Sequence, residues 1–289
     1  MTSHDVVGRL RKLLNMKRIG HGGTLDPDVT GVLPVLIGNA TRAADMMPDS
    51  EKEYRCTMKL GVRTDTEDLT GTVLFEEAVS VTKEEILSVF SSFIGDYEQV
   101  PPMYSARKVN GKKLVDLARK GIEIERTGVR REIRELELLD AAFPEVTFRV
   151  VCSKGTYIRT LCADIGKRLG TCAAMKTLVR TRHGIFRLEE SHTLEEIETS
   201  VRENDPERNL VPTEDLFESD SDCLALAEAD RFLRNGNSLA SAEVQCASSA
   251  PLTDGQRVRM RFSDGRFAGL YRYSDAEQAF LPVKLFLPE

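Results

Sequence analysis

The chain has 289 residues, of which 41% are hydrophobic and 30% are charged. This length suits one large domain or two smaller ones, and the composition excludes a disordered chain. No stretch approaches the roughly 20 apolar residues of a transmembrane helix, and no signal peptide follows Met1, so we expect a cytoplasmic protein without a membrane partner.

The net charge of −6, taken alone, argues against a nucleic-acid binder, but the charges are segregated along the chain. Residues 101–134 carry +6 and residues 149–187 carry +8, whereas residues 188–230 carry −13. A run of this kind is either ordinary solvated surface or, where it is basic, a surface that binds nucleic acid.

The cysteines have no spacing typical of a zinc site or a disulfide framework, and the histidines do not cluster with them. We therefore expect no metal and six reduced thiols that pack as small apolar groups: Cys56, Cys152, Cys162, Cys172, Cys223 and Cys246.

The N-terminal half begins with a predicted helix, in which Ser3 is the cap and apolar residues follow at helical spacing. A glycine-rich turn over 20–27 and an apolar run over 31–38 come next. Further expected elements are a strand over 52–60, a polar loop over 64–71, a helix after the capping box at 82–85, an irregular exposed segment over 101–105 and a helix over 113–120.

The C-terminal half begins with an alternating strand over 146–153. A turn over 154–156 leads into a helix that ends at Gly170, and a second capping box follows at 193–196. An acidic connector over 200–222 precedes several strand signals and a hairpin turn at 264–265. The sequence predicts two domains, 1–216 and a small β domain over 217–289.

Two segments contain candidate functional residues. The glycines at 20–23 lack the ending of a phosphate loop and the spacing of a dinucleotide site, so we expect no cofactor. Asp26, before a proline, is either a turn residue or a reactive carboxylate with His21 nearby. Arg159, after a strand-to-helix turn, is either an exposed helix residue or a fork for a carboxylate or phosphate, and Tyr157 can stack a base. Tyr54 is a core residue by default.

Four motifs, in order along essentially the whole chain, resemble the TruB family of bacterial tRNA pseudouridine-55 synthases. They are GHGGTLDPDVTGVLPVLIG at 20–38, the strand at 52–60 followed by RTDT at 63–66, the segment 102–119 with MYSA and NGKK, and SKGTYIR at 153–159. The resemblance implies an α+β fold: a mixed, mainly antiparallel central sheet with flanking helices, an RNA-binding arm and a C-terminal PUA-like domain.

The resemblance also implies a reaction, the cofactor-free isomerisation of one uridine in the T-loop of tRNA. Asp26 matches the essential aspartate (nucleophile), Tyr54 the tyrosine that stacks on the base, and Arg159 the partner of Asp26. Tyr157 and Leu178 match residues that line the uracil pocket, and His21 matches a histidine that contacts the RNA. We expect the carboxylate of Asp26 to be sheltered from water and the arm over 101–121 to be mobile.

Two departures from the family pattern stand out. The N-terminal strand ending in Lys-Pro-x-Gly is absent, which favours a truncated chain and, as an alternative function, a catalytically impaired tRNA-binding or folding module. Val115 stands where the arm often has Tyr. A weaker alternative is a subunit of a guide-RNA pseudouridylation complex. The expectation is a monomer that binds tRNA through its T-stem-loop and needs no obligatory protein partner.

Overall fold

A computed structural model of the chain describes residues 1–47, 51–105, 107–109, 111–122, 124–247 and 250–287. Asn110 of the NGKK motif therefore lies outside the described residues. The chain separates into two units, which we treat one at a time: residues 1–3, 24–34 and 48–191 form the first, and residues 4–23, 35–47 and 192–289 form the second. The predicted boundary between 216 and 217 stays a prediction.

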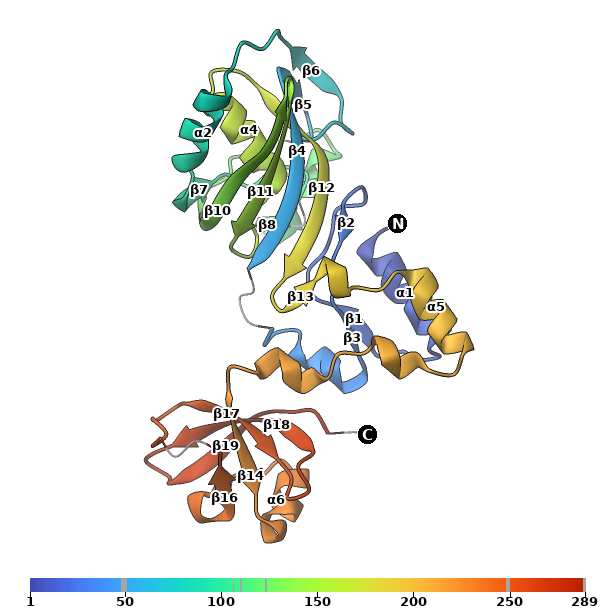
Figure 1. Ribbon diagram of the computed structural model, residues 1–289, viewed down its shortest axis with the longest axis vertical. Coiled ribbons are helices and arrows are strands. Elements are labelled where there is room, and N and C mark those ends of the chain that lie inside the picture. The colour runs from blue at the N-terminus through green and yellow to red at the C-terminus, as the bar shows by residue number, and fades with distance from the viewer. Residues whose placement is uncertain (48–50, 106, 110, 123, 248–249, 288–289) are drawn as a thin grey trace. The chain divides into compact units, whose positions relative to one another are not determined.

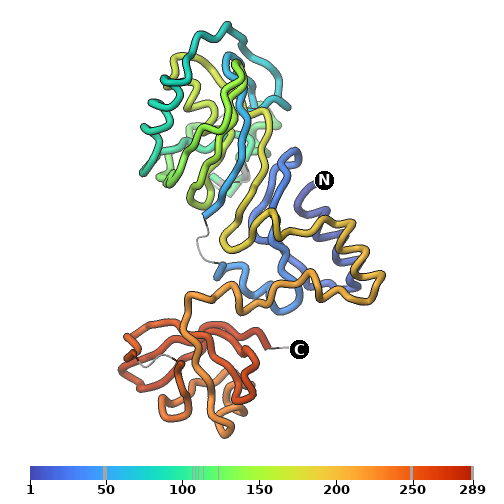
Figure 2. Tube along the Cα trace, in the orientation of Figure 1, coloured from blue at the N-terminus to red at the C-terminus, as the bar shows by residue number. Residues whose placement is uncertain are grey.

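The first unit is built on a seven-stranded sheet in the order β13-β12-β4-β11-β10-β7, with the short β2 beside β12. Neighbouring strands are antiparallel except for β2 and β12, which run parallel. Figure 2 shows β4 and β12 side by side although they are far apart in the sequence. The strands are β2 (Thr30–Gly31), β4 (Lys52–Leu60), β7 (Gly95–Gln99), β10 (Val129–Ala142), β11 (Glu145–Cys152), β12 (Ala173–His183) and β13 (Phe186–Arg187).

One face of this sheet is covered by helices α2 (Lys83–Ser91) and α4 (Ile158–Arg168), as Figure 1 shows. Because side chains alternate along a strand, every second residue of β4 points into this layer. Phe90 of α2 meets Phe148 of β11 edge-on at 5.5 Å, and Cys162 of α4 lies 3.6 Å from Cys56. The buried residues of β4 are Tyr54, Cys56, Met58 and Leu60. The core therefore lies between the sheet and these two helices.

The shorter elements of the first unit surround this layer. Two small hairpins pair β5 (Val62–Thr64) with β6 (Val73–Glu76) and β8 (Lys108–Val109) with β9 (Lys112–Lys113), and helix α3 (Leu114–Ala118) follows the second hairpin. Pro101 and Pro102, expected to be exposed, are buried, so that expectation was wrong. The prolines signal irregular backbone, which is present, but they do not determine its burial.

Helix α2 begins at the predicted capping box. The Thr82 hydroxyl accepts a hydrogen bond from the Glu85 amide, and the Glu85 carboxylate accepts one from the Thr82 amide. Replacing Thr82 by Ala is expected to lower the free energy of unfolding by about 1 kcal/mol, because one helix N–H loses its acceptor. Urea denaturation would measure the loss. Thr82→Ser keeps the hydroxyl and serves as the control, and equal stability of the two variants would contradict the assignment.

The second unit contains a six-stranded sheet in the order β15-β19-β18-β17-β14-β16 and a two-stranded pair, β1 with β3. The hairpin predicted at 264–265 joins β17 to β18, and the acidic connector forms part of α5 and short 3-10 turns. The elements are α1 (Ser3–Leu13), β1 (Ile19–His21), β3 (Val35–Ile37), α5 (Leu194–Arg202), β14 (Ser221–Ala225), α6 (Asp230–Arg234), β15 (Leu239–Ala240), β16 (Val244–Cys246), β17 (Arg257–Arg261), β18 (Phe267–Ser274) and β19 (Ala279–Leu285).

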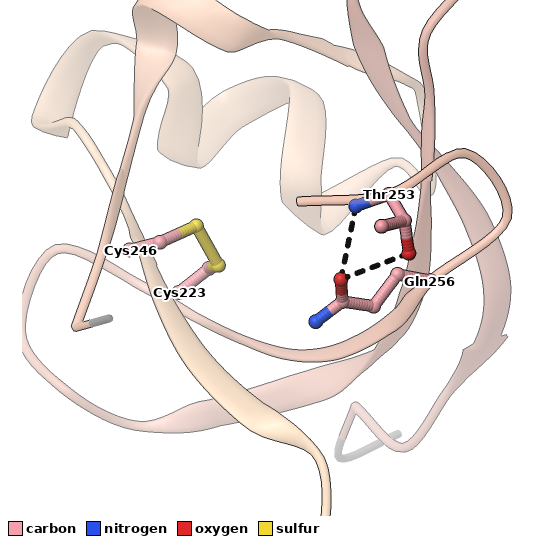
Figure 3. The surroundings of a disulfide bond; sticks show 4 residues. All are labelled: Cys223, Cys246, Thr253 and Gln256. Carbon is pink, nitrogen blue, oxygen red and sulfur yellow. Dashed lines mark hydrogen bonds between the residues drawn. A yellow bond between two sulfur atoms is a disulfide. The ribbon is translucent and has the colours of Figure 1, made fainter. Parts of the chain in front are cut away.

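The α+β fold with a mainly antiparallel sheet is confirmed, as are the predicted helices at α1, α2, α4 and α5 and the strands β4 and β11. The expectation of six reduced thiols was wrong: Cys223 and Cys246 form a disulfide in the β-rich part of the second unit (Figure 3). Strands β14 and β16 place the two residues directly opposite each other, with Cα atoms 4.0 Å apart. A separation of 23 residues gives no sign of this pairing, which arises only from the strand register.

Candidate functional site

Asp26 begins a tight turn whose first carbonyl accepts a hydrogen bond from the Val29 amide at 3.0 Å. The Asp26 side chain is 53% exposed, and its Oδ2 lies 3.0 Å from Nη2 of Arg159. Both interpretations of this residue therefore hold, since it shapes a turn and also presents a carboxylate to a cation. The expected shelter from water is absent, because the chain itself covers only about half of the side chain.

Arg159, in the first turn of α4, is buried, and its guanidinium has four partners. Nη2 contacts Asp26 and donates to the carbonyl of Tyr104 at 3.0 Å. Nη1 donates to the carbonyl of Thr66 at 3.0 Å and lies 3.5 Å from Oδ2 of Asp68. A planar guanidinium with partners on both terminal nitrogens has one orientation, so the charge facing Asp26 is fixed in place.

Asp68 is a site residue that the sequence analysis missed. Its Oδ1 accepts hydrogen bonds from the amide of Thr70 at 3.0 Å and the hydroxyl of Thr66 at 2.9 Å, which leaves Oδ2 directed at Arg159. The loop is fastened to β12 by hydrogen bonds between Met175 and the backbone of residues 67 and 69. The signal was a dense run of acids and threonines over 64–71, interpreted only as a polar loop.

Tyr54 lies on β4, on the face that packs against α4, and its cross-strand partner on β12 is Arg180. Burial raises the pKa of Tyr54 to about 12, with smaller contributions from Cys152 and Asp26, while the nearby Arg180 opposes the rise. The phenol therefore stays protonated at neutral pH. The group at this position is an aromatic ring with a protonated hydroxyl, not a phenolate.

This raised pKa predicts a pH dependence of stability. The unfolded tyrosine ionises near pH 10 and the folded one near pH 12, so the unfolded state loses its proton first and stability falls as pH rises through this window. Between pH 9 and pH 11.5, where the folded tyrosine has only begun to ionise, we expect Tyr54→Phe to remove about 2 kcal/mol of that fall. Urea denaturation at pH 9 and pH 11.5 would test it. The prediction fails if the wild type and the variant lose stability in parallel.

Arg180 is a second residue whose placement the sequence analysis missed. It is fully buried, its Nε donates to the carbonyl of Val32 at 2.7 Å, and its own carbonyl accepts from the Val32 amide at 2.9 Å. Gly31 permits this approach: its φ is +109°, and a Cβ there would lie 2.2 Å from the Arg180 carbonyl oxygen. Because side chains alternate along a strand, Arg180 lies on the same face as Leu178. This spacing of two residues could have indicated that Arg180 also points toward the site.

Of the remaining predicted site residues, Leu178 and Tyr157 lie in the first unit and His21 lies in the second. Leu178 is buried on β12 opposite Cys56, on the same face as Tyr54. Tyr157 is partly exposed and caps α4 immediately before Ile158. The first unit thus brings Asp26, Arg159, Tyr54, Tyr157 and Leu178 onto neighbouring elements. His21 ends β1 in the second unit, and its role stays a prediction.

Comparison with protein families gives two matches. Residues 11–158 match the TruB family pseudouridylate synthase N-terminal domain, and residues 159–218 match the tRNA pseudouridylate synthase B C-terminal domain. The first match includes Asp26 and Tyr54, and the second begins at Arg159.

Curated relatives resemble the chain over most or all of its length. A protein named tRNA pseudouridine synthase B from Alkaliphilus oremlandii is 40% identical over all of this chain and 95% of its own length. The protein of the same name from Lachnoclostridium phytofermentans is 42% identical over 99% of this chain and 96% of its own. That from Geobacillus thermodenitrificans is 49% identical over 74% of each chain.

Solved structures support the same core. A chain in an H/ACA RNP bound to a substrate RNA containing 2'-deoxyuridine is similar with a TM-score of 0.74 at 26% identity, over 100% of this chain and 82% of that one. A chain from a Cbf5-Nop10-Gar1 complex is similar with the same TM-score at 27% identity and the same coverage.

Proposed function

Because this chain belongs to the TruB family of pseudouridylate synthases, we propose that it isomerises uridine to pseudouridine in tRNA, at position 55 of the T-loop. The observation that carries the proposal is the ion pair between the accessible carboxylate of Asp26 and the buried Arg159, on elements adjoining Tyr54. Residues 1–216 would form the catalytic domain and residues 217–289 a PUA-like RNA-binding domain.

The reaction needs few groups. The N1–C1′ bond breaks, C5 bonds to C1′, the C5 proton leaves and N1 gains a proton, so no electrons enter or leave and no cofactor is proposed. Asp26 starts the cleavage, either by attacking the sugar or base or by assisting glycal formation. The guanidinium of Arg159 orients this carboxylate, because its Nη2 lies 3.0 Å from Oδ2 of Asp26 and is held in place by its other contacts.

The target nucleotide must leave its stacked position before the glycosidic bond can be cleaved. A uracil stacked in a folded loop hides C1′ and C5, so the nucleotide is flipped out at a cost of a few kcal/mol. Stacking on Tyr54 and contact with Tyr157 and Leu178 would offset that cost. The flipped nucleotide would also cover Asp26, which supplies the shelter that the chain alone lacks.

The decisive experiment is release of tritium from C5-labelled uridine in unmodified tRNA. The wild type should release one tritium per tRNA without added cofactor or guide RNA, and mapping should place pseudouridine at position 55. Stoichiometric tRNA binding without tritium release would instead favour the impaired binding module.

Basic side chains of the arm are proposed to bind the tRNA backbone. Within the described ranges, Arg119 and Lys120 are exposed and form no ion pair, whereas Arg130 pairs with Asp96. Replacing both Arg119 and Lys120 by Gln should lower the slope of log affinity against log salt concentration by roughly 1.5, because each phosphate contact contributes about 0.7–0.9. Filter binding at several salt concentrations measures the slope. Arg130→Gln is the matched control, and an equal change in that variant would refute the assignment to the arm.

We propose that the enzyme acts in the cytoplasm as a monomer on the T-stem-loop, without an obligatory protein partner. Within the part of the chain that the structure describes, no helix is long and apolar enough to span a bilayer. The structural neighbours come from H/ACA complexes, but relatives of 40–49% identity are named tRNA pseudouridine synthase B, which favours action on bare tRNA. Conversion of bare tRNA by the purified protein tests this.

A further inference from the structure

Gln99, the last residue of β7, is 1% exposed and uses both ends of its amide on one residue. Its Oε1 accepts from the Tyr157 amide at 2.8 Å, and its Nε2 donates to the Tyr157 carbonyl at 2.9 Å. A primary amide carries a donor and an acceptor side by side, so Gln99 can satisfy both backbone groups of Tyr157 at once.

The Tyr157 amide needs such a partner because it precedes the helix, whereas the Tyr157 carbonyl also accepts the first helical hydrogen bond, from the Leu161 amide at 3.0 Å. The Tyr157 backbone is extended, with φ −91° and ψ 110°, and its side chain makes no capping hydrogen bond. Fixing both of its backbone groups sets where the ring points and where the first turn of α4 begins. Arg159 lies in that turn, two residues further along.

The amide of Gln99 is itself held in one orientation. The hydroxyl of Tyr97 lies 3.4 Å from Nε2 of Gln99 and donates a hydrogen bond to Asp164 of α4. The Tyr97 ring packs edge-on against Phe93 at 5.3 Å. An amide with its oxygen and nitrogen exchanged would set its NH₂ group against the Tyr157 amide, where no acceptor is available. The chain of contacts therefore runs from α4 through β7 and back to the start of α4.

We propose that Gln99 is a positioning residue for uridine isomerisation, holding the ring of Tyr157 and the first turn of α4 in the geometry that the substrate requires. This inference rests on the proposed function. The strand that carries Gln99 leads directly into the arm, whose Tyr104 carbonyl accepts from the same Arg159 nitrogen that contacts Asp26. The root of the arm thus contacts the site at two points, the backbone of Tyr157 and the guanidinium of Arg159.

The test compares Gln99→Glu and Gln99→Ala with Glu98→Gln, an exposed neighbour on the same strand. Gln99→Glu keeps the acceptor but loses the donor and sets a carboxylate against the Tyr157 carbonyl. We expect kcat for tritium release to fall about 10- to 100-fold in both Gln99 variants, because a small displacement near the reacting atoms has effects of this size. Affinity for tRNA should stay within about twofold, and Glu98→Gln should match the wild type.

Two further measurements separate positioning from general destabilisation. Hydrogen exchange at the Tyr157 amide should accelerate in Gln99→Ala while exchange in β4 is unchanged, and this readout does not depend on activity. In a Tyr157→Ala background, Gln99→Glu should reduce kcat by far less than in the wild type. If Gln99→Ala unfolds, Tyr97→Phe can replace it. That variant retains the Gln99 side chain but removes the hydroxyl beside its amide, and it should give a smaller loss of kcat in the same direction.

An active wild type with unchanged kcat and Tyr157 exchange in the Gln99 variants would overturn the inference. Equal losses with and without the Tyr157 ring would overturn the role of Gln99 in positioning that ring and leave only its role at the first turn of α4. An inactive wild type would count against the proposed function instead, and the exchange measurement would still decide whether Gln99 holds Tyr157.

Discussion

Asp26→Asn is expected to lower kcat by roughly 10⁴-fold or more, equivalent to about 5 kcal/mol of transition-state stabilisation, while tRNA affinity stays within about twofold. The amide has the shape of the carboxylate but neither its charge nor its nucleophilicity. The backbone turn should survive, because the Val29 amide donates to the main-chain carbonyl of Asp26 and not to its side chain. Loss of activity would then report on chemistry rather than on folding.

Single-turnover tritium release and filter binding on the same tRNA separate the two effects. Asp28→Asn is a matched control, since Asp28 is an exposed carboxylate in the same loop. It should keep wild-type kcat. If Asp26→Asn retains full activity, the carboxylate does not start glycosidic cleavage, and the proposed mechanism is wrong.

Local signals predicted the elements whose determinants are local. The capping boxes at Thr82 and Thr193 specify the starts of α2 and α5 because both partners of each box lie within four residues. The strand β4 was predicted from its own residues. By contrast, β10 and β12 were not predicted as strands, since bulges interrupt their register at Leu138 and Arg180 and break the period of two.

The residues of the candidate site also divide into those with a local sequence signal and those without one. Asp26, Tyr54, Tyr157, Arg159 and Leu178 were found because the motifs around them resemble a family. Asp68 and Gln99 were missed because their importance lies in contacts with residues 91 and 58 positions away, which no local pattern encodes. Contacts of Arg159 with the carbonyls of Thr66 and Tyr104 leave no trace in residue identity at all.

The net charge of a segment indicates a free basic surface only when the ion-pair partners of its basic residues are known. The +8 of residues 149–187 suggests a free basic surface, yet Arg149 is surrounded by Glu53, Glu135 and Glu137. Arg159 and Arg180 in the same segment are buried. Much of this charge is therefore committed within the fold, which is why the salt experiment above targets the arm and not this segment.

Arg159→Met is expected to lower the free energy of unfolding by roughly 3 kcal/mol and to reduce kcat to near the level of Asp26→Asn. Most of the stability loss comes from Asp68 and the carbonyls of Thr66 and Tyr104, which lose their donor when the guanidinium is removed. The half-exposed Asp26 adds little to stability, because solvent screens an accessible carboxylate. The effect on activity arises because nothing orients the Asp26 carboxylate once the guanidinium is gone.

Two substitutions distinguish these effects by urea denaturation and tritium release. Arg159→Lys keeps a positive charge but cannot form the planar fork, so it should recover part of the stability and little of the activity. Lys167→Met, an exposed cation on the same helix, should change the free energy of unfolding by less than about 0.5 kcal/mol. If Arg159→Lys were as active as the wild type, charge alone would suffice. The four contacts that fix the plane of the guanidinium would then serve the fold and not the reaction.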